Sequence, residues 1–114
     1  MCWAIQRFLS LTRVRCAPSQ VALAFMSDWG VMDTPLLPHG RVTNSPEGDM
    51  LCTSLDHSMH FLRPFQADDY LLHHMVSPSA SGGRGLTRGM IYNRAGELVA
   101  LTSQESLMRN LAKL

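Results

Sequence analysis

The sequence has few of the features that place a chain in a special structural class. Only three of its 114 residues are cysteines, and their odd number and irregular spacing predict neither a disulfide framework nor a zinc site. No apolar run approaches the ~20 residues that a membrane-spanning helix requires. The net charge is only +1, without the clustered basic residues of a nucleic-acid-binding surface. We therefore expect reduced thiols, no membrane span and no nucleic-acid partner.

Motifs of nucleophilic and metal-dependent catalysis are also missing. The string Gly-x-Ser-x-Gly of α/β hydrolases does not occur, and Cys52, with apolar neighbours, is more typical of a core than of a nucleophile. Among the five histidines, His57 and His60 are three residues apart on a predicted strand and so point to opposite faces. The same geometry separates His73 from His74. We expect neither a covalent intermediate nor a bound metal.

The pattern of apolar residues predicts one helix followed by strands. Residues 19–30 are apolar almost all round, which predicts a buried helix, and the glycines and prolines of residues 30–40 and the turn-rich residues 43–49 end it. A period of two begins in residues 51–61. Further strands are expected over three ranges, which are 70–76, 86–93 and 98–108.

The connections between these strands favour an antiparallel sheet. Residues 77–85 are rich in Pro, Ser and Gly, and residues 94–96 are short enough for a hairpin. The later strands lack strict alternation, which indicates apolar cover on both faces, as when a sheet wraps a helix and also meets a partner. The expected fold class is α+β, in a single domain.

A few polar residues stand in otherwise apolar surroundings. Asp28 lies near the end of the predicted helix, where it is either a solvent-facing or capping residue or a buried functional carboxylate. Gln104 lies in an apolar strand, where its amide could simply satisfy backbone groups. Ser54 and Asp56 share one strand face, as small polar groups on a wet face often do. Spacing alone leaves these alternatives open.

Several short strings together resemble the C-terminal hotdog domain of type II acyl-CoA thioesterases. They are Ser-Leu-Asp-His-Ser-Met at 54–59, Arg-Pro-Phe at 63–65, Ala-Ser-Gly-Gly-Arg-Gly-Leu at 80–86 and Ser-Gln-Glu at 103–105, with 23–28 and 37–39 upstream. The resemblance implies an antiparallel sheet wrapped around a central helix, which is half of a double hotdog. Residues 18–110 would form this domain, after an atypical segment at 1–17 in which the usual first strand is missing or altered.

The resemblance also implies a reaction and a set of site residues. The family's catalytic aspartate, serine or threonine, and glutamine match Asp28, Ser54 and Gln104, which would activate a water to attack the thioester directly. Fatty acyl-CoA would yield free fatty acid and coenzyme A, in fatty acid metabolism and without a cofactor, since coenzyme A belongs to the substrate. Arg84 and Arg88 are candidates for binding its phosphates, although surface arginines flanked by glycine are usually just solvated.

Phe61 is a candidate for contacting the acyl chain. Because hotdog sites form where two such domains face each other, the chain would pair as a homodimer or with another hotdog domain. The alternative is a catalytically inactive, truncated hotdog module that dimerises or pairs with a full-length thioesterase. Residues 111–114 form a tail in which Ala112, Lys113 and Leu114 resemble the peroxisomal import tripeptide. We expect a peroxisomal matrix protein, or a cytoplasmic one if the import receptor does not bind this tripeptide.

Overall fold

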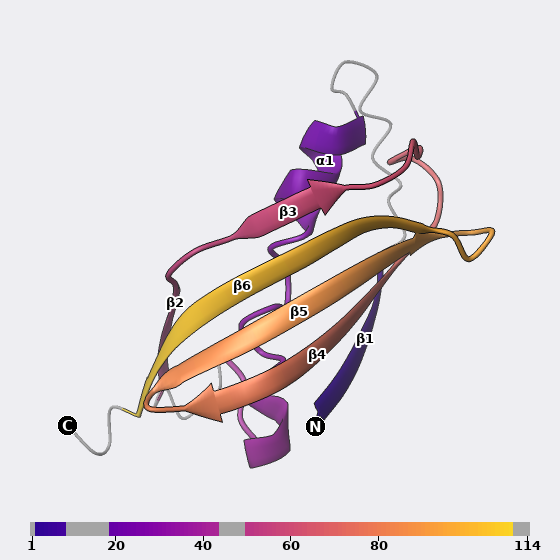
Figure 1. Cartoon of the computed structure of the whole chain (residues 1–114). Helices are drawn as coiled ribbons and strands as arrows, with labels where there is room; N and C mark the ends of the chain where they lie inside the picture. The colour runs from indigo at the N-terminus through magenta and orange to yellow at the C-terminus, as the bar shows by residue number, and fades with distance from the viewer. Residues whose placement is uncertain (1, 9–18, 44–49, 111–114) are drawn as a thin grey trace.

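The computed structural model describes residues 2–8, 19–43 and 50–110, and the first of these ranges only in its backbone (Figure 1). The elements in these ranges are β1 (Cys2–Phe8), α1 (Ser19–Met26), the short 3₁₀ helix η1 (Leu37–His39), β2 (Met50–Ser54), β3 (Ser58–Phe61), β4 (Leu71–Ser81), β5 (Arg84–Asn93) and β6 (Leu98–Asn110). The strands form one antiparallel sheet in the order β1-β4-β5-β6-β2, and β3 also pairs with β6. Figure 1 shows the chain from α1 to η1 running along one face of this sheet. The expected α+β arrangement is therefore confirmed.

The core lies between α1 and the concave face of the long strands. Leu23 is the buried residue of α1, and it packs against a cluster contributed by β4, β5 and β6, namely Leu71, Ile91, Val99 and Ala100. The turns after α1 are fixed to the same face, because Thr87 Oγ1 donates a hydrogen bond to the Val31 carbonyl at 2.8 Å. None of the helices in the described ranges is long and apolar enough to cross a membrane.

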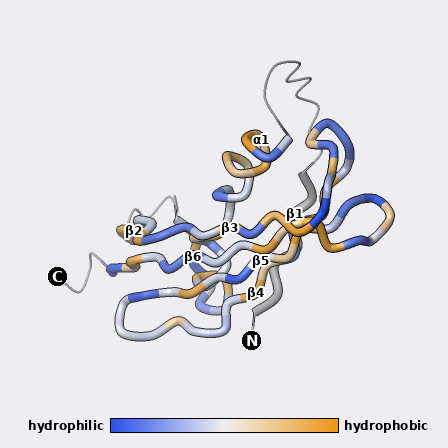
Figure 2. The backbone as a smooth tube through the Cα atoms, turned by 45° about the horizontal axis from the view of Figure 1, so that its top comes forward, coloured by the Kyte–Doolittle hydropathy of each residue, from blue (hydrophilic) through white to orange (hydrophobic). Residues whose placement is uncertain are grey.

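The helix differs from the expectation of a helix buried on all sides over residues 19–30. It begins at Ser19 as expected but ends at Met26, and residues 27–36 form turns. Val21, Phe25 and Trp29 are 59%, 71% and 60% exposed. One stripe of α1 packs on the sheet and the other side points away from it, so the prediction of all-round burial is wrong for the single chain. Figure 2 shows the hydrophobic colouring along α1.

The single strand predicted over residues 51–61 is broken in the middle. Strands β2 and β3 both pair with β6, and residues 55–57 leave the ladder between them. At the break the Leu55 N–H donates to the Glu105 carbonyl at 2.9 Å, and the Glu105 N–H donates to Asp56 Oδ1 at 2.7 Å. A side-chain carboxylate thus replaces the backbone partner that the ladder would supply.

The connection predicted at residues 77–85 is shorter than expected. Strands β4 and β5 extend to Ser81 and Arg84, which leaves Gly82 and Gly83 as the turn. Their φ values of 60° and 70° suit a two-residue hairpin with both central residues in the left-handed region. The Ser and Pro content of 77–81 is typical of a loop, but residues 79–81 pair with β5 after a register shift between Val76 and Ser79. The short hairpin at 94–96 is confirmed, since the Gly96 N–H donates to the Asn93 carbonyl at 2.9 Å.

The first strand, expected to be missing or altered, is present. Cys2–Phe8 forms β1 and pairs antiparallel with β4, from Cys2 opposite Ser77 to Phe8 opposite Leu71. Strand formation requires extended backbone and suitable propensity, which Trp3 and Ile5 supply, rather than a family motif. Residues 9–18, most of the turn cluster at 43–49, and the tripeptide Ala112, Lys113 and Leu114 lie outside the described residues.

Candidate functional site

A hollow of about 410 Å³ lies between the end of α1 and the break that separates β2 from β3. Its lining residues come from these two segments and are Ala24, Phe25, Asp28, Trp29, Ser54, Leu55, Asp56 and His57. Asp28 and Ser54, two of the three catalytic residues expected from the sequence, therefore line the same hollow. Asp28 is exposed, two residues beyond the end of α1, so its carboxylate is open to the solvent in this hollow.

The third expected residue, Gln104, lies beneath Ser54. It is on the core face of β6, only 1% exposed, and its Nε2 donates a hydrogen bond to Ser54 Oγ at 2.7 Å. The simpler interpretation, in which this amide satisfies backbone groups, does not describe these contacts, because the amide hydrogen-bonds to two side chains, those of Ser54 and His57. The structure thus brings Asp28, Ser54 and Gln104 into one place.

His57 connects this group to the helix. Its Nδ1 lies 2.5 Å from Gln104 Oε1, and its Nε2 lies 3.0 Å from Ser27 Oγ. Ser27 is 1% exposed, and its hydroxyl can also donate to the Ala24 carbonyl at 2.9 Å. The hydrogen bonds join four side chains in the order Ser27, His57, Gln104, Ser54.

Ser27 and His57 are site residues that were not predicted from the sequence. His57 was weighed there only as a metal ligand on a regular strand, whereas it lies in the break between β2 and β3. The partners of His57 are 30 and 47 residues away in the chain, so no local periodicity marks it. The available signal was its position in the string Ser-Leu-Asp-His-Ser-Met, three residues after the matched site residue Ser54.

The three residues considered for substrate binding do not line this hollow. Arg84 Nη1 lies 3.4 Å from a carboxylate oxygen of Glu105. Arg88 is exposed on β5 between buried neighbours, so it lies on the face of the sheet opposite the core. Phe61 stacks on Phe65, with ring centroids 6.2 Å apart, and lines a separate hollow of about 460 Å³.

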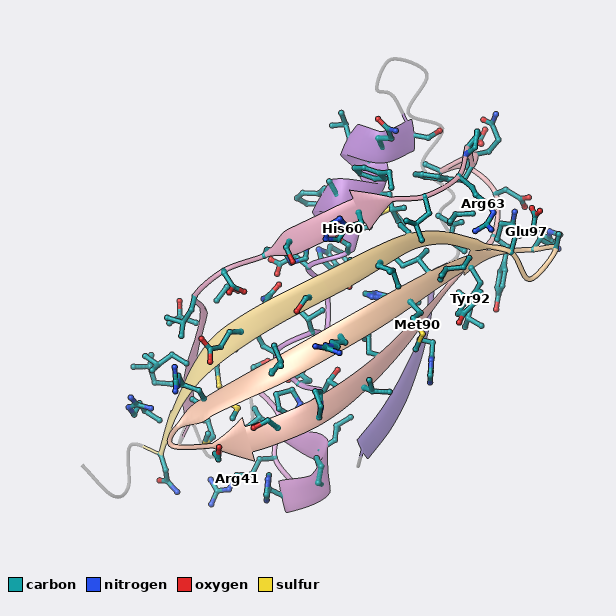
Figure 3. The ribbon with its side chains drawn as sticks, in the orientation of Figure 1. Arg41, His60, Arg63, Met90, Tyr92 and Glu97 are labelled. Carbon is teal, nitrogen blue, oxygen red and sulfur yellow. The ribbon has the colours of Figure 1, made fainter. Side chains whose placement is uncertain are left out.

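A larger hollow lies elsewhere, at the turn between β4 and β5. Its volume is about 730 Å³, and Arg41 and Arg109 are among the residues that line it. Arg109 Nη1 donates to the Gly83 carbonyl at 2.6 Å, which fixes the turn. Figure 3 shows Arg41 at the opposite end of the sheet from Arg63 and Glu97. Size alone therefore does not mark the site where the polar side chains converge.

Two titratable groups near the site have altered pKa values. Burial first, and then the nearby His57 and His74, lower the pKa of His73 from 6.5 to about 4. His73 is accordingly neutral at pH 7, in the core, with Nε2 3.3 Å from Thr102 Oγ1. Burial, with a smaller contribution from Asp33, raises the pKa of the Cys52 thiol. A thiol that stays protonated is a poor nucleophile, which agrees with the expectation that Cys52 is not catalytic.

Comparison with known proteins gives a consistent family. The profile of the acyl-CoA thioesterase family matches residues 7–107. The chain is 40% identical over 90 residues to acyl-CoA thioesterase 2 of Haemophilus influenzae, which covers 79% of this chain and 31% of that protein. It is also 40% identical over 87 residues to acyl-coenzyme A thioesterase 8 of Rattus norvegicus, covering 76% of this chain and 26% of that protein. The chain thus spans less than a third of the length of these relatives.

Solved structures agree with this result. An acyl-CoA thioesterase II from Mycobacterium marinum superimposes with a TM-score of 0.72 at 32% identity, over 95% of this chain and 50% of that one. A tesB protein from Mycobacterium avium subspecies paratuberculosis gives a TM-score of 0.78 at 26% identity, over 93% of this chain and 41% of that one. The hotdog arrangement expected from the sequence is therefore confirmed.

Proposed function

The chain belongs to the acyl-CoA thioesterase family, and from this premise we propose that it hydrolyses fatty acyl-CoA to a free fatty acid and coenzyme A. The observation that carries the proposal is the hydrogen bond from Gln104 to Ser54 at the hollow that Asp28 also lines. A carboxylate, a hydroxyl and a buried amide at one point are suited to orienting a water molecule. No cofactor is required, because coenzyme A arrives as part of the substrate.

In the proposed reaction a water between Asp28 and Ser54 attacks the thioester carbonyl carbon. Asp28 accepts one proton of the water as the new C–O bond forms, and the carbonyl oxygen becomes an oxyanion. The oxyanion then collapses, the C–S bond breaks, and the departing thiolate takes the proton back from Asp28. No acyl-enzyme forms. Positioned proton transfer of this kind contributes typically ~10²–10⁴ to the rate, and holding the water in place adds to it.

Ser54 has a specific role in this scheme. Its Oγ accepts a hydrogen bond from Gln104 Nε2, so its own proton is not used in that contact. The hydroxyl is left to donate to the attacking water or to the thioester oxygen. Gln104 acts from beneath, as the buried group that fixes the direction of the Ser54 hydroxyl.

We further propose that a second hotdog domain covers this site, in a homodimer or from another chain. In support, Phe25 and Trp29 are exposed beside the hollow, with ring centroids 6.3 Å apart, and Leu55 is 51% exposed on the opposite wall. Contiguous exposed apolar side chains of this kind mark an interface or a ligand groove more often than a free surface. The same apolar wall would contact the acyl chain of the substrate.

We propose the peroxisomal matrix as the location, through binding of Ala112, Lys113 and Leu114 by the import receptor. The support is the tripeptide itself, which is a close variant of Ser-Lys-Leu. A thioesterase there would take part in lipid and fatty acid metabolism by releasing coenzyme A from acyl chains.

The test of the proposed activity is thiol release from a series of straight-chain acyl-CoA esters by the purified chain, with its molar mass measured by light scattering in the same buffer. Hydrolysis by a dimeric species is the expected result. A folded chain that pairs but releases no thiol at any chain length would instead identify a non-catalytic hotdog module.

A further inference from the structure

The amide of Gln104 has to be held in one of two orientations. An amide rotated by 180° fits the same space, but it would present Oε1 instead of Nε2 to Ser54. In the observed orientation Nε2 donates to Ser54 Oγ at 2.7 Å. In the rotated one Ser54 would have to donate its own proton to Gln104, and it would then have none to give to the water or the thioester. The orientation of this buried amide therefore decides what Ser54 can do.

We propose that His57 is the positioning residue that fixes the amide of Gln104, an inference that rests on the proposed function. Its Nδ1 lies 2.5 Å from Gln104 Oε1, on the side of the amide away from Ser54. Because an amide oxygen only accepts, Nδ1 carries the hydrogen in this contact. A ring with hydrogen on Nδ1 stabilises the observed orientation, whereas the rotated amide would set an NH₂ group against an N–H.

Ser27 makes this arrangement compatible with either charge state of the ring. In a neutral ring with hydrogen on Nδ1, Nε2 accepts from the Ser27 hydroxyl at 3.0 Å. In a charged ring Nε2 donates to Ser27, which turns its proton to the Ala24 carbonyl at 2.9 Å. The Nδ1–H contact with Gln104 is kept in both cases. Only the neutral tautomer with hydrogen on Nε2 alone would release the amide.

The backbone break between β2 and β3 explains how His57 reaches this position. Two hydrogen bonds join the break to Glu105, from the Leu55 N–H to the Glu105 carbonyl and from the Glu105 N–H to Asp56 Oδ1. Glu105 directly follows Gln104 in β6, so the residue that carries the amide and the loop that carries the imidazole are fixed to each other. A regular strand over residues 55–57 would leave the ring on the ladder rather than over the amide.

The alternative role for His57 is simply to connect α1 to β6, and three variants separate the two roles. His57→Asn places an amide nitrogen near the position of Nδ1 and keeps the donor toward Gln104, but it loses the hydrogen bond with Ser27. Ser27→Ala removes only the contact with the helix. His57→Leu removes both contacts at similar volume. A positioning role predicts that His57→Leu lowers kcat by roughly 10- to 100-fold with little change in KM. His57→Asn should keep most of the wild-type kcat, and Ser27→Ala should change kcat only slightly.

Combination with Gln104→Ala adds a test of whether His57 acts through the amide. If it does, His57→Leu causes no further loss of kcat in the Gln104→Ala background, so the two changes are less than additive. Losses that multiply in the double variant, or a His57→Asn variant as impaired as His57→Leu, would overturn the inference.

The decisive measurement does not depend on turnover. In a chain labelled with ¹⁵N-glutamine, the side-chain NH₂ resonances of Gln104 are assigned by their absence in Gln104→Ala. We expect slow hydrogen exchange for this group in the wild type and in His57→Asn, and at least about tenfold faster exchange in His57→Leu. Unchanged exchange in His57→Leu would refute the positioning role even in an active enzyme. Conversely, slow exchange of the Gln104 NH₂ group in a chain that does not hydrolyse acyl-CoA would support the positioning role of His57. That result would count only against the proposed function.

Discussion

Acid should destabilise the fold through His73, and the size of the effect follows from its environment. The side chain is 1% exposed on the core face of β4, and its pKa is lowered from 6.5 to about 4. Between these two values the unfolded chain binds more protons than the folded one, so the free energy of unfolding falls as the pH falls through this window. The part of the free energy of unfolding that is lost in acid is present in full above about pH 6.5. The difference between the two pKa values corresponds to ~3 kcal/mol.

The assay is urea unfolding at a series of pH values from about 7 down to about 4. His73→Gln removes the titrating group and keeps a polar side chain near Thr102, and His60→Gln, at an exposed histidine of β3, is the matched control. The wild type and the control should lose ~3 kcal/mol more across this range than His73→Gln does, whatever the absolute stability of that variant. Parallel curves for the wild type and His73→Gln would refute the argument that burial keeps this ring neutral.

Three further outcomes are expected. Gln104→Ala should lower kcat for acyl-CoA by about 10²-fold, since Ser54 loses the donor that orients it; a full rate by thiol release would exclude this role. Gly89→Ala should lower the free energy of unfolding by ~1–3 kcal/mol, because an added Cβ would lie 2.2 Å from both His73 Nε2 and Thr102 Oγ1; an unchanged urea midpoint would contradict the packing. Deletion of Leu114 should move a tagged chain from peroxisomes to the cytosol, as seen by microscopy, whereas continued import would indicate another signal.

The centre of the sheet was predictable from its apolar stretches and from the turn residues between them. The expected ranges 70–76, 86–93 and 98–108 coincide, except at Tyr70, with parts of the long strands β4, β5 and β6. Two departures were not predictable, because they depend on tertiary partners. Asp56 interrupts a strand by accepting the Glu105 N–H, and β4 continues past Pro78 to Ser81 because residues 79–81 pair with β5.

The candidate site shows the same division. Asp28, Ser54 and Gln104 were identified by their resemblance to a family motif, since each alone fits a simpler structural role. Asp28 and Ser54 meet at one hollow through tertiary packing, and the pairing of β2 with β6 places the buried Gln104 within hydrogen-bonding distance of Ser54. The role of His57 was not predictable from local periodicity, because its contacts join segments that are far apart in the chain.

The burial of the helix was overestimated for a physical reason. An apolar residue composition indicates that a helix avoids water, but it does not say which molecule covers it. In α1 Leu23 faces the sheet, while Val21 and Phe25 are exposed in the single chain. The exposed side of α1 is the one that the second hotdog domain proposed above would cover.

The central claim, that Asp28 supports attack of water on a thioester, is tested most directly by comparing acyl-CoA hydrolysis by the wild-type chain and by Asp28→Asn. The substitution preserves shape at an exposed position of the hollow, so both proteins should unfold at the same urea concentration. The account predicts thiol release by the wild type and a loss of at least ~10²-fold in the variant. Equal rates for the two folded proteins would contradict it.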